Sequence, residues 1–277
     1  MPSIPVRDLE MYYELTGAQN RERLLFINGT GGDLRQKPNI LDGPLSQGFE
    51  LLGYDQRGLG QTSKPEGPYT MADYADDADA LMEALGWNDA HVVGVSFGGM
   101  VAQHLAIRHP TRVRRLVLAC TSSGGAGGAS YPLQTLADLP ESERALAGIE
   151  LSDTRYDAAW REREPEAFAS ILKMLEARGV VPGASTNPDD VADAERGAAL
   201  QLEARSHHDT FEKLDQIAAP TYICGGRYDG IAPVSNQEAL VSRIPGAALE
   251  LFDGGHLFLL QDARAFPRII EFLEEAS

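Results

Sequence analysis

A short serine turn flanked by glycines constrains the fold of this chain more than any other feature. Residues 94–98 read Gly-Val-Ser-Phe-Gly; they follow an apolar, β-branched segment and open a helical pattern that continues to residue 106. A strand that passes directly into a helix through one serine strains the backbone at Ser96, so the residues two positions away on each side must be small. Gly94 and Gly98 meet that requirement. The turn would project the Ser96 hydroxyl at the carboxyl edge of a parallel sheet, where open α/β sheets bind ligands.

Strand and helix patterns alternate on both sides of this turn. Compact apolar runs predict strands at 24–27, 49–55, 91–95, 113–120, 220–224 and 247–252. Apolar residues at steps of three and four over 71–85, with a cap formed by Thr70 and Asp73, predict an amphipathic helix. The alternation predicts an α/β fold with a mainly parallel sheet covered by helices, and a short antiparallel pair within residues 4–14.

The alternation stops in the second third of the chain. Residues 121–130 are rich in glycine and serine, and the stretch up to about residue 212 has helical patterns, one of them starting near Pro165, but no convincing strand. This stretch is too long to be an ordinary loop. We therefore predict one core, residues 1–121 and 213–277, interrupted by a helical insertion at 122–212.

Composition excludes several classes of function. The 277 residues carry 41 acidic and 24 basic side chains, a net charge of −17, and nucleic acid is itself a polyanion. We find no apolar run long enough to span a membrane, no apolar signal segment at the start, and only two cysteines. We expect a cytoplasmic protein without a nucleic-acid or membrane partner; the oligomeric state is left open.

A nucleophilic serine requires a base and a group that orients the base. His256 is the best placed of the six histidines, because it lies in the loop after the last predicted strand, behind two glycines. Asp229 follows the strand at 220–224 and therefore reaches the same sheet edge. Asp253 is the competing acid, but a residue so close to His256 in one tight loop is poorly placed to orient its ring. We predict Ser96, Asp229 and His256 as the catalytic residues.

Other candidate motifs have simpler explanations. The glycine-rich stretch 29–34 has Leu34 where a dinucleotide-binding loop needs its third glycine. The His-His-Asp run at 207–209 lacks a third ligand pattern for a metal, and Cys120 and Cys224 are most simply buried thiols. We expect neither a cofactor nor a metal.

These motifs resemble the α/β-hydrolase fold superfamily over nearly the whole chain, in its branch of serine esterases and enol-lactonases. Residues 28–32 resemble the family's oxyanion loop, 55–63 its D-x-R-G-x-G-x-S segment, and 254–256 its catalytic-histidine loop. The resemblance implies a mostly parallel eight-stranded sheet, with a helical cap at 122–212 inserted between the sixth and seventh strands. It also implies an oxyanion hole formed by the backbone N–H groups of Thr30 and Phe97. Asn28 departs from the family, which often has histidine there.

The resemblance implies a serine hydrolase that cleaves carboxylic esters of small molecules through an acyl-enzyme. A lactonase of the enol-lactone type, a perhydrolase or acyltransferase, and a small-molecule receptor of the same fold stay open as alternatives. Ser96 stands where dehalogenases and epoxide hydrolases of this fold have aspartate, and Leu257 stands where meta-cleavage hydrolases usually have tryptophan. Four residues of the cap are candidates to line the pocket: Tyr131, Trp160, Phe168 and Met174.

Overall fold

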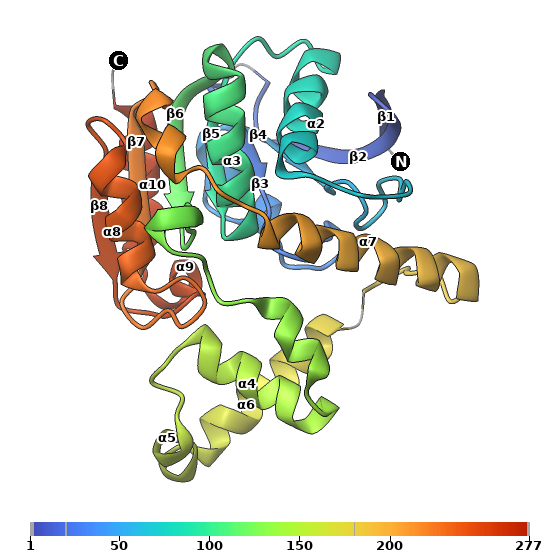
Figure 1. Ribbon diagram of the computed structural model, residues 1–277, viewed down its shortest axis with the longest axis vertical. Helices are drawn as coiled ribbons and strands as arrows, with labels where there is room; N and C mark the ends of the chain where they lie inside the picture. The colour runs from blue at the N-terminus through green and yellow to red at the C-terminus, as the bar shows by residue number, and fades with distance from the viewer. Residues whose placement is uncertain (1–2, 20, 180, 276–277) are drawn as a thin grey trace.

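The computed structural model describes residues 3–19, 21–179 and 181–275, and its centre is one eight-stranded sheet (Figure 1). The strands are β1 (Ser3–Val6), β2 (Leu9–Thr16), β3 (Arg23–Ile27), β4 (Glu50–Tyr54), β5 (Ala90–Val95), β6 (Val113–Ala119), β7 (Thr221–Gly226) and β8 (Ala248–Phe252). They are ordered β1-β2-β4-β3-β5-β6-β7-β8. The β1–β2 and β2–β4 pairs are antiparallel, and the other five pairs are parallel. The predicted eight-stranded, mostly parallel sheet is therefore confirmed.

Helices cover both faces of the sheet because its central strands are apolar on both sides. In β3, Leu25 and Ile27 pack into one core cluster with α2, α3 and α8, whereas Leu24 and Phe26 pack into a second with α1, α9 and α10. These helices are α1 (Leu45–Gly48), α2 (Met71–Ala84), α3 (Phe97–Arg108), α8 (Val234–Arg243), α9 (Phe258–Gln261) and α10 (Ala265–Glu274).

Helix α2 begins where the sequence predicts it. The Thr70 hydroxyl accepts a hydrogen bond from the Asp73 N–H, and the Asp73 carboxylate accepts one from the Thr70 N–H, both at 3.1 Å. This reciprocal cap satisfies two amide donors that a helix start leaves without a partner in the helix. The apolar stripe from Met71 to Met82 then faces the sheet and is buried.

The described residues of the insertion between β6 and β7 form four α-helices, and the insertion stands at one end of the sheet. The helices are α4 (Glu141–Ser152), α5 (Ala158–Arg163), α6 (Pro165–Gly179) and α7 (Pro188–Ser206), all within the range predicted for the cap. In Figure 1, α4, α5 and α6 form a separate group below the sheet, and α7 passes between that group and the core. Pro165 occupies the first position of α6, as expected for a residue that lacks an N–H donor.

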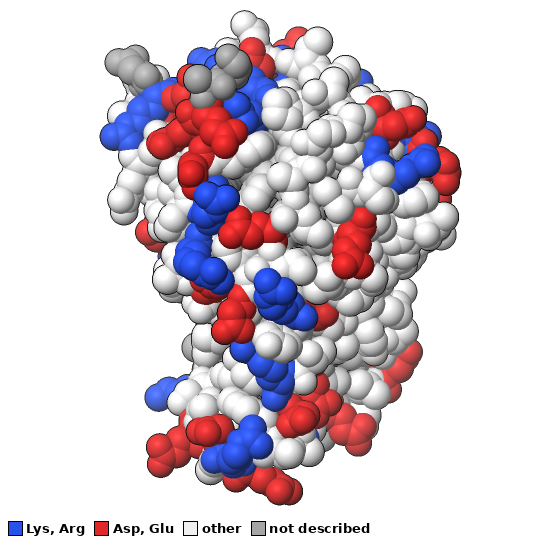
Figure 2. Space-filling view, turned by 90° about the vertical axis from the view of Figure 1, so that its left-hand side faces the viewer, with Lys and Arg blue, Asp and Glu red and all other residues white. Residues whose placement is uncertain are grey.

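Charged side chains of both signs intermingle on the surface. On the face shown in Figure 2, acidic and basic residues lie next to one another, so the excess of acidic residues does not form a patch of one sign there. Many acidic side chains form ion pairs; Arg268 and Glu250, for instance, have an N–O distance of 3.0 Å. Within the described ranges, none of the helices has the length and apolar character to cross a bilayer.

Candidate active site

Ser96 occupies a strained turn between β5 and α3. Its backbone has φ of 55° and ψ of −118°, a conformation that residues with a side chain rarely adopt. The turn is close-packed: a Cβ on Gly98 would lie 2.0 Å from the carbonyl oxygen of Ile27, and one on Gly94 would lie 2.4 Å from that of Gly98. Two further bonds hold the strained residue, from the Ser96 N–H to Ala119 (2.8 Å) and from the Thr121 hydroxyl to the Ser96 carbonyl (2.7 Å).

His256 lies in the loop after β8 and contacts both Ser96 and Asp229. Its Nε2 is 3.0 Å from Ser96 Oγ, and its Nδ1 is 2.8 Å from Asp229 Oδ2. An ionised carboxylate can only accept a hydrogen bond, so Nδ1 carries the proton in the neutral ring and Nε2 is free to accept from the serine hydroxyl. The structure thus brings together the three residues that the sequence singled out.

Asp229 is buried, whereas its competitor Asp253 is exposed. Asp229 retains 4% of its exposure, and its second oxygen, Oδ1, accepts bonds from the N–H groups of Ile231 (2.8 Å) and Ala232 (2.9 Å). The side chain of Asp253 is 68% exposed and pairs with Arg155 at 2.9 Å instead. The carboxylate that faces the imidazole therefore belongs to the loop that follows β7.

The glycine-rich loop after β3 lies beside Ser96, and side chains from outside the loop hold it. Gln56 donates to the Asn28 carbonyl at 2.8 Å, and the Gly31 N–H donates to Oε1 of Gln201 at 2.9 Å. The Gly31 N–H is therefore engaged, whereas Thr30 lines the cavity that contains Ser96. Phe97 is the first residue of α3, so its N–H has no acceptor within the helix.

Gln201 is a site residue that the sequence did not reveal. It belongs to α7, in the cap, and its side chain is fully buried although it lies 170 positions from Gly31. The glutamine helps to anchor the loop that contains Asn28, a position at which the family that the sequence resembles often has histidine. No local pattern signals such a contact, because it depends on the docking of α7 against the core.

The end of α4 is hydrogen-bonded to the loops that carry Asp229 and His256. The His256 N–H donates to the Ser152 carbonyl at 2.6 Å, and the Gly230 N–H donates to the Leu151 carbonyl at 3.0 Å.

Beside these two contacts, the fully buried Asp153 accepts hydrogen bonds from Arg155 (2.7 Å) and from Gln261 (3.0 Å). The cap thus contributes to the position of the base and the acid, although the reacting side chains all come from the core.

Two adjoining hollows open at this sheet edge. A cavity of about 610 Å³ contains Ser96 and His256 and has apolar walls that include Phe26 and Ile231. A second, of about 580 Å³, lies under α4 and α6. Leu257 and Leu260 line both cavities.

Four cap residues were expected to line the pocket. Met174 lines the second cavity, and Tyr131, Trp160 and Phe168 line neither cavity.

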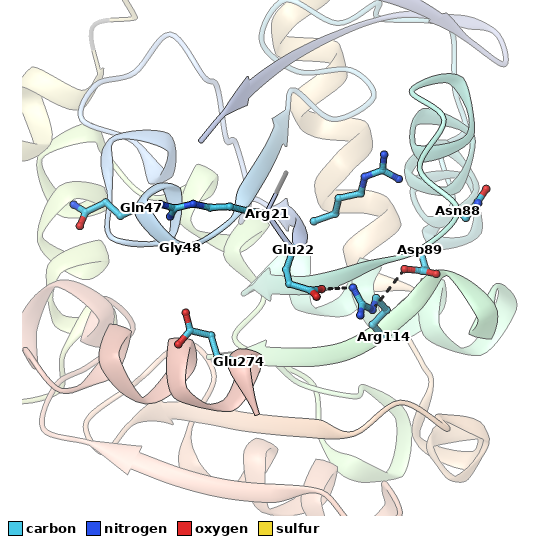
Figure 3. A pocket seen from close by; sticks show the side chains of 9 residues that line it. Arg21, Glu22, Gln47, Gly48, Asn88, Asp89, Arg114 and Glu274 are labelled. Atoms are coloured by element: carbon cyan, nitrogen blue, oxygen red, sulfur yellow. Dashed lines mark hydrogen bonds and ion pairs between the residues drawn. The ribbon is translucent and has the colours of Figure 1, made fainter. Parts of the chain in front are cut away.

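A larger hollow, of about 790 Å³, lies elsewhere, around the loop before β3, the start of β6 and the end of α10 (Figure 3). Ion pairs occupy part of its wall: Arg114 contacts both Glu22 and Asp89. It opens at the amino-terminal ends of the parallel strands, away from Ser96.

Among the described residues, one group of possible metal ligands lies at the site of Ser96 and His256. Single ligand atoms of Cys120, Asp229 and His256 lie within 4.8 Å of one another. The Asp229 and His256 atoms are already hydrogen-bonded to each other, and burial raises the pKa of the Cys120 thiol well above its usual range. A metal binds a cysteine as the thiolate, so this group of three side chains is poorly suited to hold a metal ion.

A strained serine between strand and helix, with a histidine and a buried aspartate at the same sheet edge, defines the class of α/β enzymes built on a nucleophile elbow. The chain matches the model of the alpha/beta hydrolase fold family over residues 22–263. It belongs to that family and is a hydrolase.

Several characterised proteins are similar to this chain. It is 31% identical over 255 residues to a poly(3-hydroxyalkanoate) depolymerase of Ectopseudomonas oleovorans, covering 91% of this chain and 84% of the depolymerase. It is 32% identical to a 2-hydroxymuconate semialdehyde hydrolase of Pseudomonas putida, covering 83% and 79%. The crystal structure of the enol-lactonase from Burkholderia xenovorans LB400 superposes with a TM-score of 0.77 at 27% identity, covering 99% of this chain and 100% of the lactonase.

Proposed function

We propose that the protein is a serine hydrolase that cleaves carboxylic esters of small molecules through an acyl-enzyme. The observation that carries this proposal is the continuous hydrogen-bonded path from Ser96 Oγ through His256 to Asp229, with steps of 3.0 and 2.8 Å. A hydroxyl, an imidazole and a buried carboxylate in this order are what acyl transfer by serine requires.

The chemistry has two halves. His256 Nε2 takes the proton from Ser96 as Oγ bonds to the ester carbonyl carbon; the bond to the alcohol oxygen then breaks, and His256 returns the proton to the leaving alkoxide. In the second half His256 takes a proton from water as the water oxygen bonds to the acyl carbon; the bond to Oγ then breaks, His256 returns the proton to Ser96, and the carboxylic acid leaves. The Thr30 and Phe97 N–H groups would bind the oxyanion, each contributing about 3 kcal/mol to transition-state stabilisation.

An apolar acyl or alcohol chain suits the walls of this site. The cavity at Ser96 is predominantly apolar, and it shares Leu257 and Leu260 as wall residues with the hollow under the cap. The depolymerase relative acts on a polyester of hydroxyalkanoate units, which supports ester cleavage as the reaction.

The test is turnover of nitrophenyl esters with acyl chains of graded length. We expect hydrolysis by the wild type, a loss of kcat of at least about 1,000-fold in Ser96→Ala, and covalent labelling of Ser96 by an alkylphosphonate. Ser242→Ala, in the exposed part of α8, is the matched control and should keep wild-type rates. Ligand binding without turnover or labelling would instead identify a receptor, and the proposal would be wrong.

Hydrolysis of lactones is the second candidate. The structural similarity to an enol-lactonase over the whole chain favours it, and a lactone is an internal ester that the same residues would open. Enol-lactones, simple lactones and a meta-cleavage product, offered beside the open-chain esters, rank the candidates by kcat/KM. Added alcohol or peroxide tests for acyl transfer to an acceptor other than water.

A further inference from the structure

A small cavity of about 100 Å³ lies at the junction of the core and the cap, apart from the active site. Met100 and Ser122 line it from the core, Ser130 and Pro132 from the segment that leaves β6, and Arg205 from the end of α7. None of its lining residues lines the cavity that contains Ser96.

The cavity holds a buried guanidinium without a counter-ion. Arg205 is 6% exposed, and its Nη2 donates to the hydroxyl of Ser130 (2.7 Å) and the carbonyl of Tyr131 (2.8 Å), both uncharged acceptors. Its Nε has no hydrogen-bond partner. No ion pair of the described residues includes Arg205, and burial lowers its pKa to about 10. A buried cation without a paired charge is strongly unfavourable.

A second polar group in the same cavity also lacks a partner. Ser122 is 1% exposed, and its hydroxyl makes no hydrogen bond. Its carbonyl accepts a bond from His208 Nε2 at 3.0 Å, so the proton of a neutral His208 is on Nε2, and its Nδ1 accepts from His104 at 3.3 Å. Burial lowers the pKa of His208 to about 3, which leaves Arg205 as the one charged side chain among the lining residues.

We propose that this cavity binds a small monovalent anion, a halide or a short carboxylate, between Arg205 and Ser122. One positive charge selects a single negative charge, and an unpartnered N–H and hydroxyl supply donors for it. A volume of about 100 Å³ admits an anion of a few heavy atoms and excludes the esters that fit beside Ser96.

The anion stabilises the contact between core and cap. Gly124 forms an isolated β-bridge with Asp209, and the Thr210 N–H donates to the Ser123 carbonyl at 2.8 Å. The two chain segments that connect the core to the cap therefore lie next to the cavity. An anion that binds only the folded state raises the stability of that state by mass action. This proposal does not depend on which bond the enzyme cleaves.

The experiment compares unfolding temperatures of the full chain in sodium chloride, sodium acetate and sodium gluconate at the same sodium concentration. Constant sodium keeps the screening of the net charge of −17 the same, and gluconate is too large for the cavity. Chloride or acetate should raise the unfolding temperature of the wild type by about 2–6 °C along a saturating curve. The salt with the lower half-saturation concentration shows whether the cavity prefers a halide or a short carboxylate.

Arg205→Met keeps the bulk of the side chain without its charge and should lose the saturating response. Arg196→Met, on the same helix but paired with Asp193, is the matched control and should respond as the wild type does. Equal responses in Arg205→Met and the wild type, or coincident wild-type curves in all three salts, would overturn the proposal.

Two measurements cover the case in which Arg205→Met does not fold. Ser122→Ala keeps the cation and should raise the half-saturation concentration several-fold. A crystal of the wild type soaked in bromide should show an anomalous peak beside Arg205; its absence at a bromide concentration above half-saturation would contradict the site.

Discussion

The core and the inserted cap obey different rules of packing. In the core, β5, β6 and β7 are almost entirely buried, and α3 is buried along most of its length. In the cap, α5 has no buried residue, and among the described residues of α4 the one buried apolar residue is Ile149. Tight packing holds the reacting atoms to a fixed geometry, whereas a lightly packed cap can change shape or sequence at little cost to stability.

The two ends of the cap differ from its middle. The end of α4 is hydrogen-bonded to the loops of Asp229 and His256, and α7 brings Gln201 and Arg205 into the interior. In the middle, α6 contributes Ile171 and Met174 to the wall of the second cavity, and α5 contributes none; the described residues of both helices make no hydrogen bond to the reacting residues. The comparison predicts three levels of sensitivity: core residues control catalysis, the cap ends control alignment and stability, and the middle of the cap controls substrate choice.

Asp229→Asn should have the largest effect. An amide in place of the carboxylate offers an N–H to His256 Nδ1 and favours the wrong tautomer, so kcat should fall by roughly 1,000- to 10,000-fold with little change in fold. Asp253→Asn is the matched control in the loop of His256 and should stay within about threefold of the wild type, as expected for an exposed acid. Steady-state kinetics of both variants decide; the reverse ranking would show that Asp253 is the orienting acid.

Asp153→Ala should have the next largest effect and tests the α4 end. It removes one acceptor from Arg155, which keeps its pair with Asp253, and one from Gln261, beside the loop of His256. We expect a loss of about 1–3 kcal/mol in the free energy of unfolding and a several-fold lower kcat with nearly unchanged KM. Asp157→Ala removes the cap of α5, in the middle of the insertion, and should cost about 1 kcal/mol while kcat is kept. Equal kcat in the two variants would contradict the alignment role.

Acid should weaken the junction of core and cap through His104 and His208. Burial lowers the pKa of His104 to about 4 and that of His208 to about 3, whereas both are about 6.5 in the unfolded chain. The unfolded state therefore binds the protons first, and the stability is fully present above pH 6.5 and is lost as the pH falls toward the folded-state values.

Between pH 7 and pH 5 the loss should be about 1–2 kcal/mol per histidine. Urea unfolding at both pH values measures it, and His104→Gln/His208→Gln should show a smaller loss over the same interval. The interpretation would fail if the double variant lost as much stability as the wild type.

Met174→Ala should have the smallest effect on the fold. The residue is 42% exposed in α6, so the free energy of unfolding should change by no more than about 0.5 kcal/mol. Because Met174 lines the hollow that adjoins the active-site cavity, kcat/KM should fall a few-fold more for long-chain esters than for acetate esters. Equal changes at all chain lengths would separate this hollow from the substrate path.

Local sequence patterns predicted the core well. The glycines around Ser96, the strand before it and the helix after it follow from sterics within a few residues, and the structure places them as expected. Asp229 and His256 were found from their positions after strands, since parallel strands end at one edge. Of the four cap residues named as candidates, three line neither cavity, because helical periodicity identifies an apolar face without showing what that face contacts.

The sequence by itself therefore determined the α/β architecture, the family and the three residues that meet at the sheet edge, since each depends on short-range sterics and strand order. Only the tertiary structure decided how the cap docks: Gln201 against Gly31, Ser152 against His256, and Arg205 in a cavity without an acid. Those contacts join positions far apart in the chain, and their stability arises from burial and hydrogen-bond geometry that exist only after the two parts have packed together.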